Sequence, residues 1–399
     1  MWRAPVHTYI IDTPDGSSVN YTDKKRIWWL LSLVNPLIPL AGLVGQHFSG
    51  SENWLFVPLA LMFVMGPVLD WVFGEDENNP PEILVPQLEQ DAYYRILTYL
   101  TVPLHYLTFV LVAIWVGTQS LSVWGFLAIT LATGFADGFA INTGHELGHK
   151  RTGLETWLAK IVLAVPAYGH FWIEHNRGHH RDVATPEDPA SSRMGENIYK
   201  FALREIPGAF RRAWKIERGR LARKKVSFWG PHNEIIQSYL LTLVIQVSLV
   251  YVFGWIMLPF LMIHNVLSWW VLTSANYIEH YGLLREKLED GKYERCQPHH
   301  SWNANHKYSN LLLFHLQRHS DHHANPTRRY QSLRHFDSLP GLISGYYGMY
   351  IIAYLPHLWF KIMDKRLLAL PHIRGDLGKV NIDPDRYTAI RARYGQFSV

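Results

Sequence analysis

The stretch 121-LSVWGFLAITLATGFADGFAINTGHELGH-149 joins a membrane-spanning segment to a pair of possible metal ligands. Residues 121–141 are mostly apolar and about as long as the ~20 residues that a helix needs to cross a bilayer. His145 and His149 follow four residues apart, and this spacing places both imidazoles on one face of a helix. The stretch therefore predicts a metal site at the end of a transmembrane helix.

The rest of the chain repeats the apolar pattern. Only 18% of its residues are charged, against ~25% in typical soluble domains. We expect an all-α fold: a polytopic bundle forming one integral-membrane domain over residues 1–399, with a helical cap that holds a histidine-rich site for two metal ions. A further apolar stretch, 157–171, is too short to span and is expected to be an interfacial or re-entrant helix. The expected spans are 26–47, 54–74, 95–118, 121–141, 236–255 and 258–278.

The distribution of Lys and Arg predicts the orientation. Both are abundant in 150–225, especially 211–225, and near the C-terminus, whereas the loops 48–53 and 119–120 contain neither. Because cytoplasmic loops carry the excess of Lys and Arg, we expect both termini and the polar segments 142–235 and 279–399 to be cytoplasmic. The net charge of +5 is then explained by topology rather than by nucleic-acid binding. The N-terminal residues lack the features of a signal peptide.

Nine of the 22 histidines lie in four places near the expected cytoplasmic ends of the spans. Ionisable groups just inside the membrane surface are costly in free energy unless they are paired or coordinated, so these histidines indicate a functional site. Nine nitrogens are too many for one ion, and two ions with an open position would suit Fe(II) and oxygen activation, although Zn, Cu and Mn stay open. The expected ligands are His145 and His149; His175, His179 and His180; His280; and His319, His322 and His323.

Other histidines, carboxylates and apolar residues are expected to have different roles from these ligands. His105, His264, His315 and the pair His299-His300 are expected not to bind the metals. Carboxylates could accept the remaining N–H of a ligating imidazole or bridge two ions, or could be ordinary surface or capping groups. The candidates are Glu146, Glu174, Asp182, Glu187, Glu279 and Asp321. Candidates for the end of a substrate channel are Trp54, Leu61, Met62 and Trp71 in the second span.

Residues 145–149 also match the H-E-x-x-H pattern of zinc proteases, with Glu146 as a general base. That chemistry needs three protein ligands and leaves six clustered histidines unexplained. The single cysteine, Cys296, excludes an iron–sulfur cluster or a zinc–thiolate site within this chain. We also expect neither haem nor flavin.

The motifs 145-HELGH-149, 175-HNRGHH-180 and 319-HSDHH-323 resemble those of the integral-membrane di-iron desaturases and hydroxylases. With 276-NYIEHYGL-283 and the longer motifs 174–196 and 316–326, the chain is similar to the bacterial alkane 1-monooxygenases. This resemblance implies that the nine histidines bind two non-haem irons in a protein of the bacterial inner membrane.

The same resemblance implies a reaction and its partners. The terminal carbon of a medium- or long-chain n-alkane would be hydroxylated to the 1-alkanol with O2. Electrons would come from a reduced rubredoxin, a separate protein because this chain has one cysteine, and from its NAD(P)H-dependent reductase. Membrane lipid is also an expected partner, and nucleic acid is not. The alternatives are a fatty-acyl desaturase, a hydrocarbon side-chain hydroxylase and, more remotely, the zinc protease.

Overall fold

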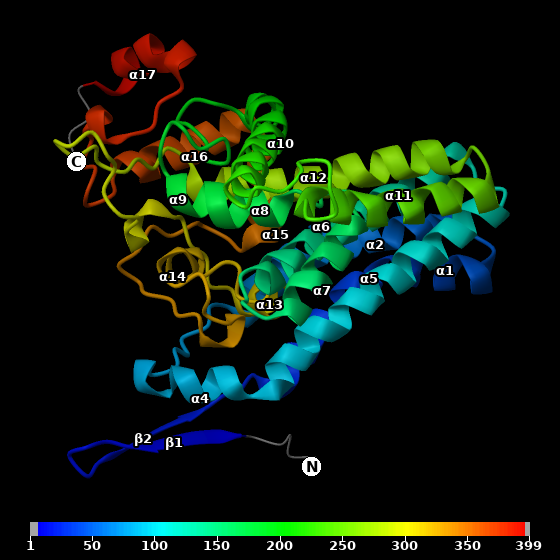
Figure 1. The fold of residues 1–399 in the computed structure, drawn as a ribbon, viewed down its shortest axis with the longest axis horizontal. Coiled ribbons are helices and arrows are strands. Elements are labelled where there is room, and N and C mark those ends of the chain that lie inside the picture. The colour runs from blue at the N-terminus through cyan, green and yellow to red at the C-terminus, as the bar shows by residue number, and fades with distance from the viewer. Residues whose placement is uncertain (1–6, 396–399) are drawn as a thin grey trace.

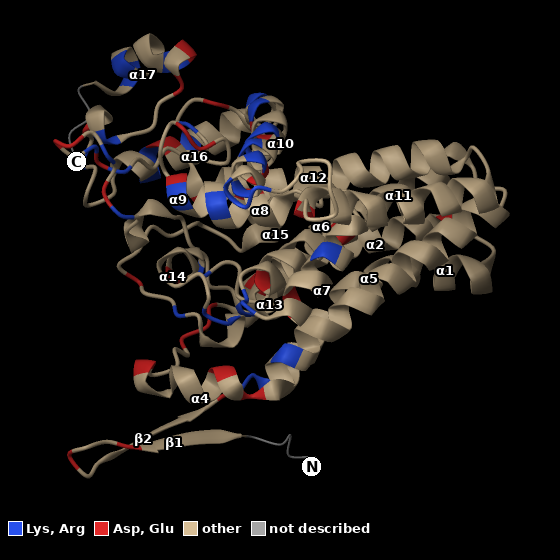
Figure 2. Ribbon diagram, in the orientation of Figure 1, with Lys and Arg blue, Asp and Glu red and all other residues tan. Residues whose placement is uncertain are grey.

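The computed structural model describes residues 7–395, and most of them are helical (Figure 1). The chain begins with an antiparallel hairpin of β1 (Thr8–Asp12) and β2 (Ser18–Thr22), in which Tyr9 pairs with Tyr21. Long helices form a bundle on one side of the molecule, and shorter helices and loops form a cap at one end of that bundle (Figure 1). Charged residues gather in the cap and are rare in the bundle (Figure 2).

Six helical segments are long and apolar enough to cross a membrane, as predicted. The first joins 3-10 turns at Arg26–Leu33 and Asn35–Leu37 to α1 (Ile38–Ser49). The second joins a 3-10 turn (Glu52–Phe56), α2 (Val57–Ala60), a π-helical turn (Leu61–Met65) and α3 (Gly66–Phe73). The other four are α5 (Ala92–Thr118), α6 (Val123–Gly148), α11 (Glu234–Phe253) and α12 (Met257–His280).

The cap consists mostly of shorter elements, with the 26-residue α10 as the exception. Its helices are α4 (Val85–Gln90), α7 (Gly153–Ala164), α8 (Phe171–Glu174), a π-helical turn (His175–His179), α9 (His180–Asp182), α10 (Ile198–Arg223), α13 (Lys307–Leu312), α14 (His319–Ala324), α15 (Tyr346–Ala353), α16 (Pro356–Leu368) and α17 (Tyr387–Tyr394). Short 3-10 turns lie at Glu82–Leu84, Pro298–His300, Tyr330–Ser332, Leu377–Lys379 and Pro384–Arg386.

Two boundaries differ from the sequence prediction. α6 continues past residue 141 to Gly148, so the helix itself carries His145 into the cap. The stretch 157–171 is not one helix: α7 ends at Ala164, and α8 begins only at Phe171. Pro166 accounts for the break, because a proline ring clashes with the carbonyl four residues earlier. The next residue, Ala167, turns the chain with a φ of +54°.

α6 and α12 pack closely at the centre of the molecule, and glycines allow it. A Cβ at Gly134 would lie 2.9 Å from the carbonyl oxygen of His264, and one at Gly138 would overlap Val271. Small residues let membrane helices approach in this way. The close approach matters for the site because His145 and His280 lie in the final turns of these two helices, at the same end of the bundle.

Asp137 of α6 bridges two histidines inside the bundle. Its Oδ1 lies 2.8 Å from Nδ1 of His105 on α5, and its Oδ2 lies 2.9 Å from Nε2 of His264 on α12. All three side chains are buried. His105 and His264, which we expected not to bind the metals, therefore belong to one polar link between three spans.

We expect Asp137→Ala to lower the free energy of unfolding by about 3–5 kcal/mol, because it leaves two buried imidazoles without their shared partner. Unfolding in mixed detergent micelles would measure this loss. Asp290→Ala is the control, since its ion pair with Lys292 is exposed to solvent. Equal stability of the two variants would show that the Asp137 bridge does not hold the bundle together.

Candidate metal centre

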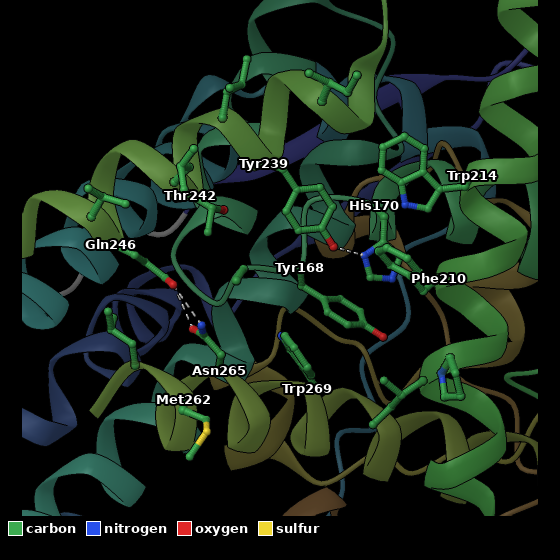
Figure 3. Close-up of a pocket in the computed structure, with 18 of the residues that line it drawn as sticks. Tyr168, His170, Phe210, Trp214, Tyr239, Thr242, Gln246, Met262, Asn265 and Trp269 are labelled. Carbon is green, nitrogen blue, oxygen red and sulfur yellow. Dashed lines mark hydrogen bonds between the residues drawn. The ribbon is translucent and has the colours of Figure 1, made fainter. Parts of the chain in front are cut away.

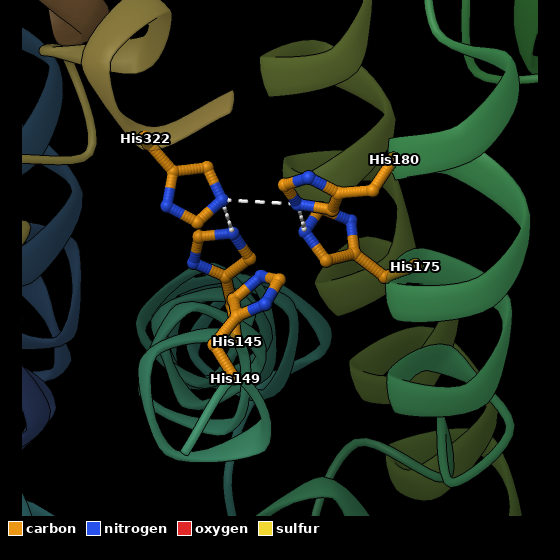
Figure 4. Close-up of side chains that lie close together, drawn as sticks. All are labelled: His145, His149, His175, His180 and His322. Carbon is orange, nitrogen blue, oxygen red and sulfur yellow. Dashed lines mark hydrogen bonds between the residues drawn. The ribbon is translucent and has the colours of Figure 1, made fainter. Parts of the chain in front are cut away.

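The nine histidines predicted as ligands converge in two adjoining groups. The first contains His145, His149, His175, His180 and His322, and the second contains His179, His280, His319 and His323. Within each group the candidate ligand atoms all lie within 4.8 Å of one another. Figure 4 shows the first group, in which imidazoles from three separate segments point toward a common centre. The two groups adjoin at His180 and His323, whose ring centroids are 4.4 Å apart.

The π-helical turn explains how neighbouring histidines serve different groups. Its wider i→i+5 pattern brings His175 and His180 to the same side, with their Nε2 atoms 3.0 Å apart. His179, next to His180 in sequence, then faces the second group. π-Turns of this kind are frequent at functional sites. The adjacent pair 179–180 can therefore supply one imidazole to each of two ions.

Distances between the imidazoles fit metal coordination. The Nε2 atom of His322 lies 2.9 Å from that of His145 and 3.1 Å from that of His180. In the second group, Nε2 of His319 lies 2.9 Å from that of His323 and 3.2 Å from that of His280. Two nitrogens bound at ~2.1 Å to one ion lie about 3.0 Å apart at a right angle, and about 3.4 Å apart in a tetrahedron. The spacing therefore fits several imidazoles bound to one ion in each group.

Two further nitrogens support the same interpretation. Nε2 of His149 and Nε2 of His179 are buried and have no hydrogen-bond partner among the described residues. Buried polar atoms without a partner cost free energy, so such atoms need an explanation. A cation at the centre of each group would satisfy both nitrogens. The residues present therefore fit a pair of metal ions.

The protonation state of the imidazoles also suits metal binding. Burial, reinforced by neighbouring imidazoles, lowers the pKa of five cap histidines well below the usual value, so that they are neutral at pH 7. A neutral imidazole offers a nitrogen lone pair to a metal, whereas a protonated one does not. These five are His175, His180, His319, His322 and His323.

Asp188 orients one ligand, and sequence reasoning missed it. Its Oδ2 accepts a hydrogen bond from Nδ1 of His179 at 2.9 Å, and its other contacts include Arg212 and Ser191. Burial alone would lower the pKa of His179, but the adjacent carboxylate raises it. This contact fixes the ring so that Nε2 faces the second group. Asp188 lies inside the 174–196 motif, but the sequence cannot show whether it or Glu187 turns inward.

Among the six predicted carboxylates, Glu279 lies beside a group. Its Oε2 is 3.4 Å from Nε2 of His319, and its Oε1 accepts a hydrogen bond from the Tyr346 hydroxyl at 2.8 Å. The other five bond elsewhere: Glu146 to Lys150, Glu174 and Asp182 to Arg212, Glu187 to Tyr293, and Asp321 to Arg328. A backbone group also orients a ligand, since Nδ1 of His280 lies 3.3 Å from the carbonyl oxygen of His300.

His300 and His315 lie outside the two groups. Nδ1 of His300 accepts a hydrogen bond from the backbone N–H of Gln297 at 2.9 Å, so the proton of the neutral ring is on Nε2, 3.4 Å from Glu294. That nitrogen is then a donor to a carboxylate rather than a metal ligand. His315 lies with its Nδ1 2.7 Å from the carbonyl oxygen of Tyr330. His300 nevertheless forms a third group of possible metal ligands with Glu294 and His299, so the expectation that the pair His299-His300 binds no metal stays a prediction.

A small cavity of about 30 Å³ adjoins both groups. Its walls come mainly from α6 and α12, and they include His145, His319 and Glu279 beside apolar residues such as Phe139 and Val271. The four predicted channel residues lie elsewhere: Trp54 packs on Gly45, Leu61 is half-buried, Met62 packs in the core, and Trp71 is 82% exposed on the outside of the bundle.

Comparison with known proteins adds to this geometry. A family model described as fatty acid desaturase matches residues 122–354. The chain is 53% identical over 381 residues to alkane 1-monooxygenase 1 of Alcanivorax borkumensis, covering 96% of this chain and 94% of that one. It is 54% identical over 378 residues to alkane 1-monooxygenase of Pseudomonas putida, covering 95% and 92%. It is 41% identical over 407 residues to alkane 1-monooxygenase of Acinetobacter baylyi, covering 98% and 97%.

We expect Asp188→Ala to weaken metal binding about 10- to 100-fold, because His179 loses the carboxylate that orients it. Metal content after dialysis against a graded series of chelator concentrations would measure the change. Glu187→Ala is the matched control: it removes the neighbouring carboxylate, which is exposed and contacts Tyr293. If the two variants retain metal equally, Asp188 does not orient a ligand.

Proposed function

The chain belongs to the alkane 1-monooxygenase family, and on that premise we propose that it is a non-haem di-iron enzyme that hydroxylates the terminal carbon of medium- or long-chain n-alkanes. The observation that carries the proposal is the convergence of nine imidazoles in two groups beside a cavity with apolar walls. Neither group includes a sulfur or carboxylate ligand among the residues that the structure describes. Imidazole nitrogen with open positions suits iron and oxygen chemistry.

Two irons, held by the five-histidine and the four-histidine groups, would supply the oxidising power that cleavage of an unpolarised C–H bond requires. Burial keeps five of the imidazoles neutral, and hydrogen bonds orient others, as the bond to Asp188 does for His179. Phe139, Val271 and Ala275 line the cavity with apolar surface and keep water from the reacting carbon. The cavity has about the volume of one water molecule in the liquid, which suits a terminal methyl group.

The overall reaction would consume one O2, two electrons and two protons per alkane, and it would give the 1-alkanol and water. The electrons require a separate donor, which we propose to be a rubredoxin served by an NAD(P)H-dependent reductase. His180 is the one ligand candidate that is partly exposed at the cap surface, while the other eight are buried. An acidic donor would therefore approach most closely over α9.

The basic stretch 211–225 contributes less free charge than its sequence suggests. Arg212 bonds Glu174 and Asp188 below it, and Arg220 bonds Glu217. Arg212 ties α10 to the segment 174–188, and Arg220 is paired within α10, so neither guanidinium group is available to a docked protein. Lys and Arg are nevertheless numerous on the cap (Figure 2), and they support the proposal that the cap and both termini lie on the cytoplasmic side of the bacterial inner membrane.

The alternative activities differ in what they require. A zinc protease would need Glu146 free to act on a bound water, but its Oε1 lies 3.0 Å from Nζ of Lys150 and 3.4 Å from the backbone nitrogen of Tyr330. A desaturase or a side-chain hydroxylase would use the same nine histidines. Product analysis separates these two from the proposal, because a desaturase yields an alkene without added oxygen.

We expect the purified protein, loaded with iron and supplied with octane, O2, rubredoxin and its reductase, to form 1-octanol and to contain about two irons per chain. Metal analysis together with mass spectrometry of the product would measure both. Activity in protein that contains no iron would contradict the proposal, and so would octene as the main product.

Substitution of a single ligand should lower both iron content and turnover. His319→Ala removes a nitrogen that approaches both His280 and His323, so we expect at least one iron to be lost and turnover to fall at least 100-fold. His299→Ala is the control, because His299 lies outside the two groups. Equal losses in the two variants would show that the ligand set is wrong.

A further inference from the structure

A large groove lies on the side of the bundle, between α10, α11 and α12 and against the turn that joins α7 to α8 (Figure 3). Its volume is about 1210 Å³, and most of its lining is apolar. Leu240, Leu243 and Met262 line it and are also exposed on the outer surface of the spans. The groove therefore opens toward the acyl chains of the bilayer.

A narrow passage, closed even to a water molecule in this structure, lies between this groove and the metal centre. Tyr168 and His170 line both the groove and the passage. At its inner end, Phe171, His175 and Leu272 line both the passage and the small cavity beside the histidine groups. The passage therefore lies directly between the site of the proposed chemistry and the lipid-facing groove, and side chains along it would have to move for a molecule to pass.

The junction of groove and passage contains polar atoms without partners. Tyr168 and His170 are each 98% buried, yet the Tyr168 hydroxyl and Nε2 of His170 have no hydrogen-bond partner among the described residues. The other ring nitrogen of His170 lies 2.8 Å from the hydroxyl of Tyr239, which holds the ring in place (Figure 3). Nε1 of Trp214, farther out in the groove, is also buried without a partner.

The backbone fixes this arrangement. Ala167 has a φ of +54°, a conformation that non-glycine residues rarely adopt, and it sets the direction of the turn before Tyr168. Gly169 allows α11 to approach, because a Cβ at this position would overlap the Ser238 side chain. Such local strain is often retained where it positions a functional group.

We propose that the Tyr168–His170 junction binds the hydroxyl group of a linear primary alcohol, the product of the proposed reaction, and directs it from the metal centre into the groove. The inference rests on the proposed function. The alkane has no polar atom, so it gains nothing from the two unpartnered groups. The alkanol has a hydroxyl that can donate to Nε2 of His170 and accept from the Tyr168 hydroxyl.

The groove suits the rest of such a molecule. Its apolar walls would take the alkyl chain, and the Trp214 N–H would offer the hydroxyl a next partner nearer the opening. Tryptophan is enriched where membrane meets water, which is also where the hydroxyl of a long-chain alcohol resides. The alcohol would thus leave laterally into the bilayer, with its polar end leading toward the interface.

Photolabelling tests this assignment without turnover. The iron-loaded protein in lipid nanodiscs is labelled with an octan-1-ol that carries a diazirine, and unlabelled 1-octanol or octane is added as competitor. We expect labels on groove residues, and we expect 1-octanol to compete at lower concentration than octane. Tyr168→Phe should weaken competition by 1-octanol about three- to ten-fold and leave competition by octane unchanged, because one neutral hydrogen bond is lost.

Tyr168→Phe should fold normally, because the hydroxyl it removes has no protein partner. Unchanged iron content would verify this. The matched control is Tyr251→Phe, which removes a hydroxyl from the 90% exposed Tyr251 on α11 and should leave both competitors unchanged. Equal competition by octane and 1-octanol would overturn the proposal, since the groove would then hold any alkyl chain. An unchanged value for 1-octanol in Tyr168→Phe would also overturn it.

The photolabelling result can be distinguished from the test of the proposed hydroxylase activity. Alcohol-selective labelling that depends on Tyr168, in a protein that forms no octanol from octane, would refute the hydroxylase and leave an alcohol-binding site. Octanol formation with labelling that ignores Tyr168 would refute the exit route and leave the hydroxylase intact.

Discussion

Buried imidazole nitrogens without hydrogen-bond partners are the constraint on which the rest of this structure depends. Such atoms cost free energy, and nine imidazoles meet here at one end of a helix bundle. A cation in each group would give the unpartnered Nε2 atoms of His149 and His179 a partner. Since the ligands come from the C-terminal end of α6, the π-helical turn with α9, α12 and α14, two cations would also join segments far apart in sequence. Metal binding would therefore also stabilise the packing of the cap.

The helix bundle positions two of the histidines and provides apolar surface beside them. Glycines bring α6 and α12 together, so that His145 and His280 reach the cap at one depth. The same two helices provide the apolar walls of the cavity, and α12 also borders the lipid-facing groove. A substrate that dissolves in the bilayer can thus be oxidised at the edge of the apolar region, and a product with a polar end can leave by a route that recognises that end.

Much of this was predictable from the sequence. Apolar length identified six spans, and the spacing of histidines identified nine residues that the structure brings together. Both signals are local: the first needs composition over ~20 residues, and the second needs only that i and i+4 share a helical face. The cysteine count also excluded an iron–sulfur cluster and a zinc–thiolate site, because the chain has one cysteine.

What escaped prediction depends on side-chain direction and on long-range packing. Asp188 and Glu187 are adjacent carboxylates, and only the fold turns the first toward His179. Trp71 looked like a channel residue because it lies in a span, but helix rotation places it outside. The π-helical turn that separates His179 from His180 has no clear sequence signature. The sequence does not show that Tyr168 and His170 line the groove with buried polar atoms that have no hydrogen-bond partner, because this depends on the packing of the helices around them.

X-ray absorption at the iron edge tests the central claim most directly, because it reports the atoms bound to each iron. We predict about two irons per chain, each surrounded by four or five imidazole nitrogens and no sulfur. One iron per chain, or an iron bound mainly by carboxylate oxygen, would contradict the account.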